Sequence, residues 1–142
     1  GTAKRAPALG PLDVIAHAAL AIGDDSDIGH LRDFGRPQLA LYIGGMGARG
    51  RNFYNDLARR LGYEAEAKAI QDAYLDGRKA EAEALVPAEL VERTSLIGPA
   101  SYVAERIAAY REAGVTTLNV TPLATDLEAR IRLIEQVRAL TD

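Results

Sequence analysis

The segment 44–50 carries the most recognisable chemical pattern in the chain. Gly45-Met46-Gly47-Ala48-Arg49-Gly50 matches G-x-G-x-x-G, in which glycines let the backbone approach a pyrophosphate. A dinucleotide site also needs a second strand after the following helix, with an acidic residue at its end. Residues 64–76 are rich in alanine and glutamate and predict a helix instead. We therefore expect a glycine-rich connection between helices, with a nucleotide-binding protein using residues 45–50 as the alternative.

The same segment has the composition of an anion site. Gly44, Gly45, Gly47 and Arg49 come directly before a predicted helix, whose first N–H groups attract negative charge. The competing interpretation is a helix C-cap followed by a flexible loop. Both interpretations stay open at this point.

Two further turns follow predicted strands and precede predicted helices. They are Gly98-Pro99-Ala100-Ser101 and the segment that begins at Thr121. Ligands, and phosphates in particular, collect at the carboxyl ends of parallel strands, where backbone N–H groups and helix dipoles converge. Ordinary capping by Ser101 and Thr125 is the alternative.

The rest of the chemistry is sparse. There is no cysteine, and His17 and His30 have no second imidazole at ligand spacing, so both are expected to be structural. The acidic cluster at 24–27 is typical of helix capping, and we assign no metal. No serine lies in a G-x-S-x-G context, and no catalytic residue can be named.

Composition limits the partners. With 17 basic and 20 acidic residues the net charge is -3, which does not favour nucleic acid as a partner. No apolar run reaches the roughly 20 residues that span a bilayer, and the first residues do not resemble a secretion signal. We expect a cytoplasmic protein in which residues 1–142 form a single unit.

The hydrophobic pattern predicts an α/β chain that is mostly helical by content. Residues 12–22 form an apolar run typical of a buried strand, and residues 26–92 read as a series of helices. Residues 94–140 predict strand, helix, strand, helix, with a capping box at 125–128. This alternation implies parallel strands.

Three parallel strands leave both edges of the sheet unpaired, and parallel sheets are rarely so small. The first residue is not methionine. We therefore expect the C-terminal part of a larger barrel or sheet. A non-enzymatic alternative is a helical interaction module whose sheet is completed by a partner chain or by self-association.

Several segments together resemble the C-terminal part of luciferase-like monooxygenases, and most closely the coenzyme F420-dependent oxidoreductases of actinobacteria. The segments that carry the resemblance are Leu41-Tyr42-Ile43-Gly44-Gly45-Met46-Gly47, Asn52-Phe53-Tyr54, Gln71-Asp72-Ala73-Tyr74, Val86-Pro87-Ala88-Glu89-Leu90-Val91 and Leu96-Ile97-Gly98-Pro99. The similarity extends from about Asp13 to Leu140.

The resemblance implies a (β/α)8 TIM barrel, with strands six, seven and eight at 14–22, 94–97 and 115–121 and a helical insertion before the seventh. It implies hydride transfer between F420, or alternatively FMN, and a small organic substrate. Gly44, Gly45, Gly47, Arg49, Gly98 and Thr121 are then candidate cofactor-binding residues. Because the family's ring-binding and acid–base groups come mostly from the first five strands, we expect the 142 residues alone to be inactive and to associate with the missing N-terminal half of the barrel or with themselves.

Overall fold

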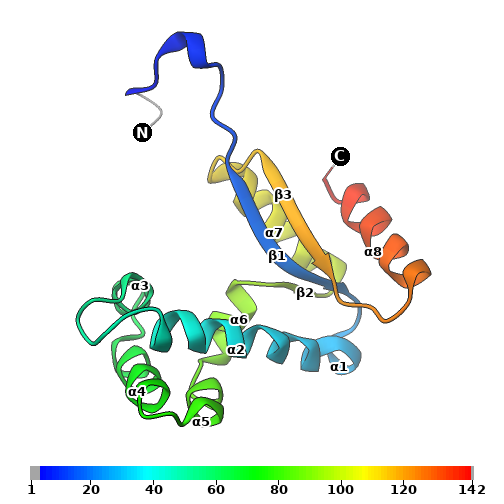
Figure 1. Ribbon diagram of the computed structural model, residues 1–142. Helices are drawn as coiled ribbons and strands as arrows, with labels where there is room; N and C mark the ends of the chain where they lie inside the picture. The colour runs from blue at the N-terminus through cyan, green and yellow to red at the C-terminus, as the bar shows by residue number, and fades with distance from the viewer. Residues whose placement is uncertain (1–3, 142) are drawn as a thin grey trace.

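The computed structural model describes residues 4–141 and contains one parallel sheet and two groups of helices (Figure 1). The strands are β1 (Ile15–Ile22), β2 (Leu96–Gly98) and β3 (Thr117–Pro122). The helices are α1 (Asp25–Ile28), α2 (Arg36–Ala40), α3 (Phe53–Arg60), α4 (Glu64–Leu75), α5 (Lys79–Ala84), α6 (Ala88–Arg93), α7 (Ala100–Glu112) and α8 (Leu127–Ala139). Short 3-10 helices occupy Pro7–Leu9 and Gly29–Gly35, and a π-helical turn, Leu41–Gly45, continues α2. The α/β class and the parallel sheet are confirmed.

The sheet order is β2-β1-β3, so the first strand lies in the middle. An arc of consecutive barrel strands would place β2 in the middle, and the expected order of strands six, seven and eight is therefore not seen. The physical reason lies in strand length. β3 has six residues and pairs along all of them with β1, whereas β2 has three residues and offers backbone partners to only half of β3.

One face of the sheet is covered by α7 and α8. Leu20 of β1 and Leu96 of β2 are fully buried there against Val103 and Ile107 of α7, and Val137 of α8 completes this core. The side chains of β1 and β3 that point to this face are apolar. This arrangement leaves the opposite face to the segment between β1 and β2.

The helices α2 to α6 form a second core of their own. Ala40 and Ile43 pack against Ile70 and Ala73 of α4, with Val86 also buried in this group. Figure 1 shows this helical group beside one end of the sheet. None of the helices between residues 4 and 141 is long and apolar enough to cross a membrane.

Two local expectations need correction. α3 forms as its spacing predicts, but its apolar stripe of Phe53, Leu57 and Leu61 is exposed, and the residues it buries are Asn55 and Ala58. The capping box expected at 125–128 is also not formed in that register. The N-cap of α8 is Asp126, whose carboxylate accepts from the amide of Ala129 at 2.8 Å.

Candidate functional site

A row of polar side chains occupies the face of the sheet that α7 and α8 leave uncovered. Successive residues of a strand point to opposite faces, so His17 of β1 shares this face with Thr117, Asn119 and Thr121 of β3. His17 lies directly opposite Asn119, and Ala19 lies opposite Thr121. Parallel sheets are usually apolar on both faces, because helices cover both. A polar face therefore indicates contact with water or with a polar ligand.

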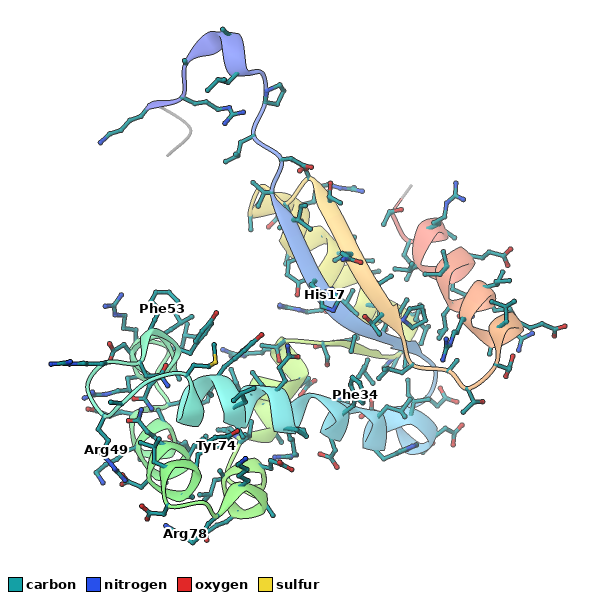
Figure 2. All side chains as sticks on the ribbon, in the orientation of Figure 1. His17, Phe34, Arg49, Phe53, Tyr74 and Arg78 are labelled. Atoms are coloured by element: carbon teal, nitrogen blue, oxygen red, sulfur yellow. The ribbon has the colours of Figure 1, made fainter. Side chains whose placement is uncertain are left out.

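A cavity of about 480 Å³ lies over this face. Its floor includes His17, Ala19 and Thr121, and its walls come from the segment Gly29–Gly35, from α2 and from the residues around β2. Figure 2 shows His17 on β1 and Phe34 on the helical segment next to it. The cavity is lined by His17, Ala18, Ala19, Arg32, Phe34, Gly35, Gln38, Leu39, Tyr42, Val91, Thr94, Ser95, Ile97 and Thr121.

His17 and Thr121 meet on the floor of the cavity. The Thr121 Oγ1 and the His17 Nε2 are 3.3 Å apart, a hydrogen bond whose direction depends on the imidazole tautomer. Both side chains are exposed. This contact holds the imidazole against β3 and leaves the other side of the ring available to a ligand.

Arg32 is the cavity residue with a permanent charge, and its hydrogen bonds are taken by the protein. It forms an ion pair with Asp25, with an Nη2–Oδ1 distance of 2.5 Å. It also donates to the carbonyl oxygen of Ile97 from Nε at 3.2 Å and from Nη2 at 2.8 Å. The hydrogen bond from Arg32 lowers the pKa of Asp25, and the same bond raises the pKa of Arg32. The guanidinium therefore closes the free edge of β2 and contributes little net charge to the cavity.

Two of the six predicted cofactor-binding residues lie at the strand ends around this cavity. Thr121 forms part of its floor. Gly98 ends β2 beside the lining residue Ile97, and a Cβ at this position would lie 3.0 Å from Tyr102 Cδ1 and 3.3 Å from Arg32 Nη2. Gly98 thus gives Arg32 and Tyr102 room to pack.

The other predicted glycines form a packing site. A Cβ on Gly44 would lie 2.5 Å from Tyr74 Cβ, and one on Gly45 would lie 2.4 Å from Tyr74 Cε1. A Cβ on Gly47 would lie 2.4 Å from the carbonyl oxygen of Arg51. The protein already fills the space on the Cβ side of these glycines, so packing explains why they carry no side chain.

Arg49 is likewise engaged by the protein. Its Nε lies 2.8 Å from Asp72 Oδ1, and its Nη2 lies 3.6 Å from Asp76 Oδ1. Hydrogen bonds from Lys68 and Arg49 lower the pKa of Asp72, which keeps that carboxylate charged. Two carboxylates balance this guanidinium, which lines a separate cavity of about 620 Å³ that Arg59 and Lys68 also line, and not the cavity over the sheet.

The dinucleotide interpretation of residues 45–50 fails its structural requirement. The segment follows the helical turn Leu41–Gly45, and α3 is followed by the helix α4 where a second strand would be needed. The glycine-rich segment is the helix-to-helix connection that the sequence favoured.

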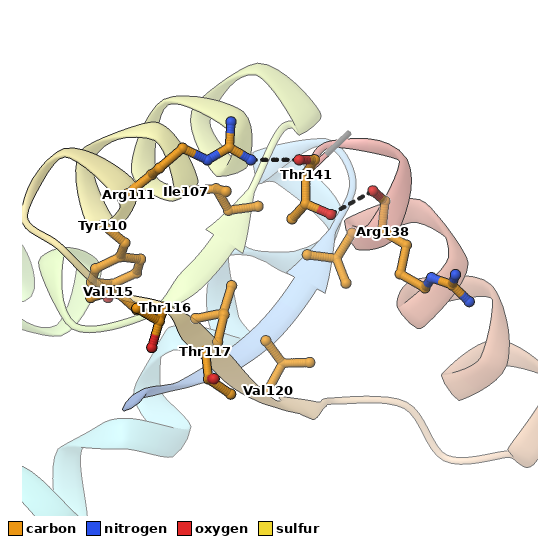
Figure 3. A pocket seen from close by; sticks show the side chains of 11 residues that line it. Ile107, Tyr110, Arg111, Val115, Thr116, Thr117, Val120, Arg138 and Thr141 are labelled. Carbon is orange, nitrogen blue, oxygen red and sulfur yellow. Dashed lines mark hydrogen bonds between the residues drawn. The ribbon is translucent and has the colours of Figure 1, made fainter. Parts of the chain in front are cut away.

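A second cavity, of about 420 Å³, lies on the opposite face, between the ends of α7 and α8 (Figure 3). Ile107, Val120 and Val137 supply apolar walls, and Arg111 donates to the carbonyl oxygen of Thr141 at its rim. This cavity is a gap in the helix layer near the amino end of β3. It brings together no set of groups for chemistry, so the cavity over the polar face is the better candidate.

Sequence reasoning missed His17, Phe34 and Tyr42 as site residues. His17 was expected to be structural because its strand is apolar, yet its side chain is exposed in the cavity. One usable signal was present in the sequence. In a strand expected to be parallel, polar residues alternate with apolar ones at Thr117, Asn119 and Thr121. This alternation indicates that one face of the sheet contacts water or a polar ligand.

Comparison with known proteins gives two matches. A family model described as luciferase-like monooxygenase matches residues 1–117. A Mycobacterium tuberculosis protein named as a coenzyme F420-dependent oxidoreductase is 41% identical over 86 residues, which are 61% of this chain and 25% of that protein. The match therefore spans about a quarter of the length of this curated relative. No solved structure matches the chain significantly.

Proposed function

Because the chain belongs to the luciferase-like monooxygenase family, we propose that it is part of an oxidoreductase that transfers hydride between coenzyme F420 and a small organic substrate. The observation that supports F420 is the identity of 41% to a relative named for that coenzyme. FMN is the alternative cofactor. When bound, either group supplies the hydride chemistry, while the protein supplies binding and orientation.

The candidate residues Gly44, Gly45, Gly47 and Arg49 are poorly placed for the anionic tail of a deazaflavin. An anionic tail needs unpaired cations or free backbone N–H groups. Arg49 is paired with carboxylates, and the protein fills the Cβ side of the three glycines. We propose that the chain contributes at the substrate side of the site.

For the architecture, we propose that these residues are the C-terminal portion of a (β/α)8 barrel, with residues 26–92 as a helical insertion. The parallel strands, the order of strand and helix along the chain and the family support this proposal. The sheet order β2-β1-β3 differs from a barrel arc. In a closed barrel β3 would pair with β2, and the edge of β1 that β3 occupies here would belong to another strand.

For partners, we propose association with the N-terminal half of such a barrel or, in its absence, self-association. Exposed apolar side chains support this, because burying them on a second surface removes them from water. Examples on three different elements are Phe34, Phe53 and Leu127, whose exposed fractions are 66%, 68% and 73%.

The experiment that tests the function is a titration of the protein that carries this chain with F420 and, separately, with FMN, followed by cofactor fluorescence. We expect a saturable change with F420 and a weaker one with FMN. Binding of FMN alone would transfer the proposal to the flavin alternative, and binding of neither would contradict it.

A further inference from the structure

We infer that α3 is a contact surface for a second copy of this chain, in which the two α3 helices pack antiparallel across a two-fold axis next to Leu57. This inference goes beyond the proposed redox function, because it involves neither a cofactor nor a substrate. It also does not depend on how the strands pair, since α3 belongs to the helical group that has a core of its own.

The inward side of α3 is polar, and this fixes how the helix is oriented. Asn55 is buried and donates to two backbone carbonyl oxygens, at 3.1 Å and 2.7 Å. The apolar stripe of Phe53, Leu57 and Leu61 lies on the outward side, with exposed fractions of 68%, 40% and 57%. Covering this stripe removes three large apolar side chains from water, which favours association.

Aromatic contacts hold the amino end of the stripe in place. Phe53 packs edge-to-face on Tyr54, with the ring centroids 5.4 Å apart, and Tyr54 stacks on Tyr42 at 4.7 Å. Figure 2 shows Phe53 on the side of α3 away from α4. A large ring that is already held loses little side-chain entropy when a partner covers it, which is typical of anchor residues at protein interfaces.

The charges beside the stripe favour a copy of the same helix as the partner. Asp56 and Arg60 lie one helical turn apart on one flank of the stripe. Within residues 4–141 neither side chain forms an ion pair or a hydrogen bond, whereas Arg59 on the same helix is paired with Glu64.

An antiparallel pair uses these two charges twice. Across a two-fold axis the same flank of both helices meets, so Asp56 of each copy faces Arg60 of the other. One helix therefore supplies both members of two ion pairs. An unrelated partner would have to carry the complementary pattern independently, and this is why we commit to a second copy.

The expected interface is small. α3 has eight residues and spans about 12 Å, so its contact alone gives a weak and reversible dimer. Leu57 faces its own equivalent at the centre, and Phe53 faces Leu61 of the second copy at each end. The surface then has an apolar centre and a charged rim, as protein interfaces commonly do.

Exchange of the two charges tests the pairing, in the protein that carries this chain, by sedimentation velocity over a range of concentrations at low salt. We expect Asp56→Arg and Arg60→Asp each to weaken dimerisation by about 3- to 30-fold, because each places like charges together twice in a symmetric dimer. The double variant restores opposite charges and should dimerise like the unchanged protein. Glu89→Arg, at an exposed carboxylate of α6, makes the same change in net charge and should have no effect.

Three results would overturn the inference. One is a monomer at every concentration, and another is a dimer that both single variants leave unchanged, as when the rest of the protein covers α3. The third is a double variant that dimerises as weakly as the single variants. Because no cofactor takes part, these results do not bear on the proposed redox function.

Discussion

At the residue scale, the glycines in the segment 44–47 owe their position to packing. Gly44 and Gly45 lie in the π-helical turn that continues α2, and Tyr74 of α4 packs directly on their backbone. Ile70 also approaches, since its carbonyl oxygen would lie 3.1 Å from a Cβ on Gly44. Because these glycines have no side chain, the turn Leu41–Gly45 and α4 can approach each other closely. Close packing is therefore the alternative to an anion site as the reason for these glycines.

Gly44→Ala should destabilise the protein by about 1–3 kcal/mol, because the new methyl group would overlap Tyr74 Cβ in a packed region. Urea denaturation measures the effect. Gly35→Ala is the control, since Gly35 has a helical backbone and its nearest neighbour would be Val91 Cγ1 at 3.6 Å. Equal stabilities for the two variants would contradict the packing role.

Asn52 is a second residue whose environment fixes its role. It is 1% exposed, and its Oδ1 accepts from the amides of Tyr54 and Asn55 at the start of α3. Its Nδ2 donates to the carbonyl oxygens of Tyr42 at 2.9 Å and Ile43 at 3.0 Å. One side chain therefore caps α3 and ties it to the preceding helical turn.

We predict that Asn52→Ala lowers the free energy of unfolding by about 2–4 kcal/mol. The loss combines a helix cap of about 1 kcal/mol with the loss of the hydrogen bond to the Tyr42 carbonyl, at about 1–3 kcal/mol, while the Ile43 carbonyl keeps its hydrogen bond from Asn55. Asn52→Asp keeps the cap acceptor but loses both donors, and it should be at least as destabilising. Recovery of most of the stability by Asn52→Asp in thermal unfolding would show that capping alone matters.

At the element scale, the strands and helices could be predicted because their signals are local. The apolar run of β1 and the β-branched run of β3 identify strands, and Gly62 ends α3 with a φ of 97°, as its position after the apolar stripe suggested. The strand order and the cavity could not be predicted. The strand order depends on which strand edges pair, and the cavity depends on how the segment Gly29–Gly35 folds back over the sheet. Both features arise from contacts between distant segments, which local sequence patterns do not reveal.

Backbone hydrogen bonds define which edge of β3 is free. The amide of Thr117 donates to Val14 at 3.1 Å, and the amide of Leu123 donates to Leu20 at 2.9 Å. In a parallel ladder alternate residues face the same neighbour, so the amides of Asn119 and Thr121 also face β1.

Hydrogen exchange tests this register. We predict slow exchange for the amides of Thr117, Asn119 and Thr121, and faster exchange for those of Leu118 and Val120, which face away from β1. NMR of the chain in deuterium oxide, at a concentration low enough to keep it monomeric, provides the measurement, because pairing with a second copy would also cover the outer edge of β3. Protection of Leu118 and Val120 at the level of their neighbours would mean that another strand covers the outer edge of β3.

At the scale of the whole molecule, the two edges of the sheet differ. The edge of β2 is closed by Arg32, which donates to the Ile97 carbonyl, while β3 is the other edge strand of the three. Unpaired strand edges invite pairing with another chain. The exposed apolar stripe on α3, formed by Phe53, Leu57 and Leu61, is a second surface at which another chain can bind.

These surfaces predict self-association of the 142-residue chain. Sedimentation velocity over a range of concentrations should show species larger than a 15.2 kDa monomer. Replacing Leu57 and Leu61 by Gln should reduce association through α3, since both side chains are exposed and their replacement leaves the core intact. A monomer at every concentration would contradict the proposal that these surfaces take a partner.

We propose that this chain lies at the substrate side of an F420-dependent oxidoreductase and that other parts of the protein hold the coenzyme. The most direct measurement is a fluorescence titration of F420 with the 142-residue chain alone. We predict no saturable change, because Arg32 and Arg49 are paired and the glycines of the segment 44–47 are packed. Binding of F420 by the chain alone with micromolar affinity would contradict the account.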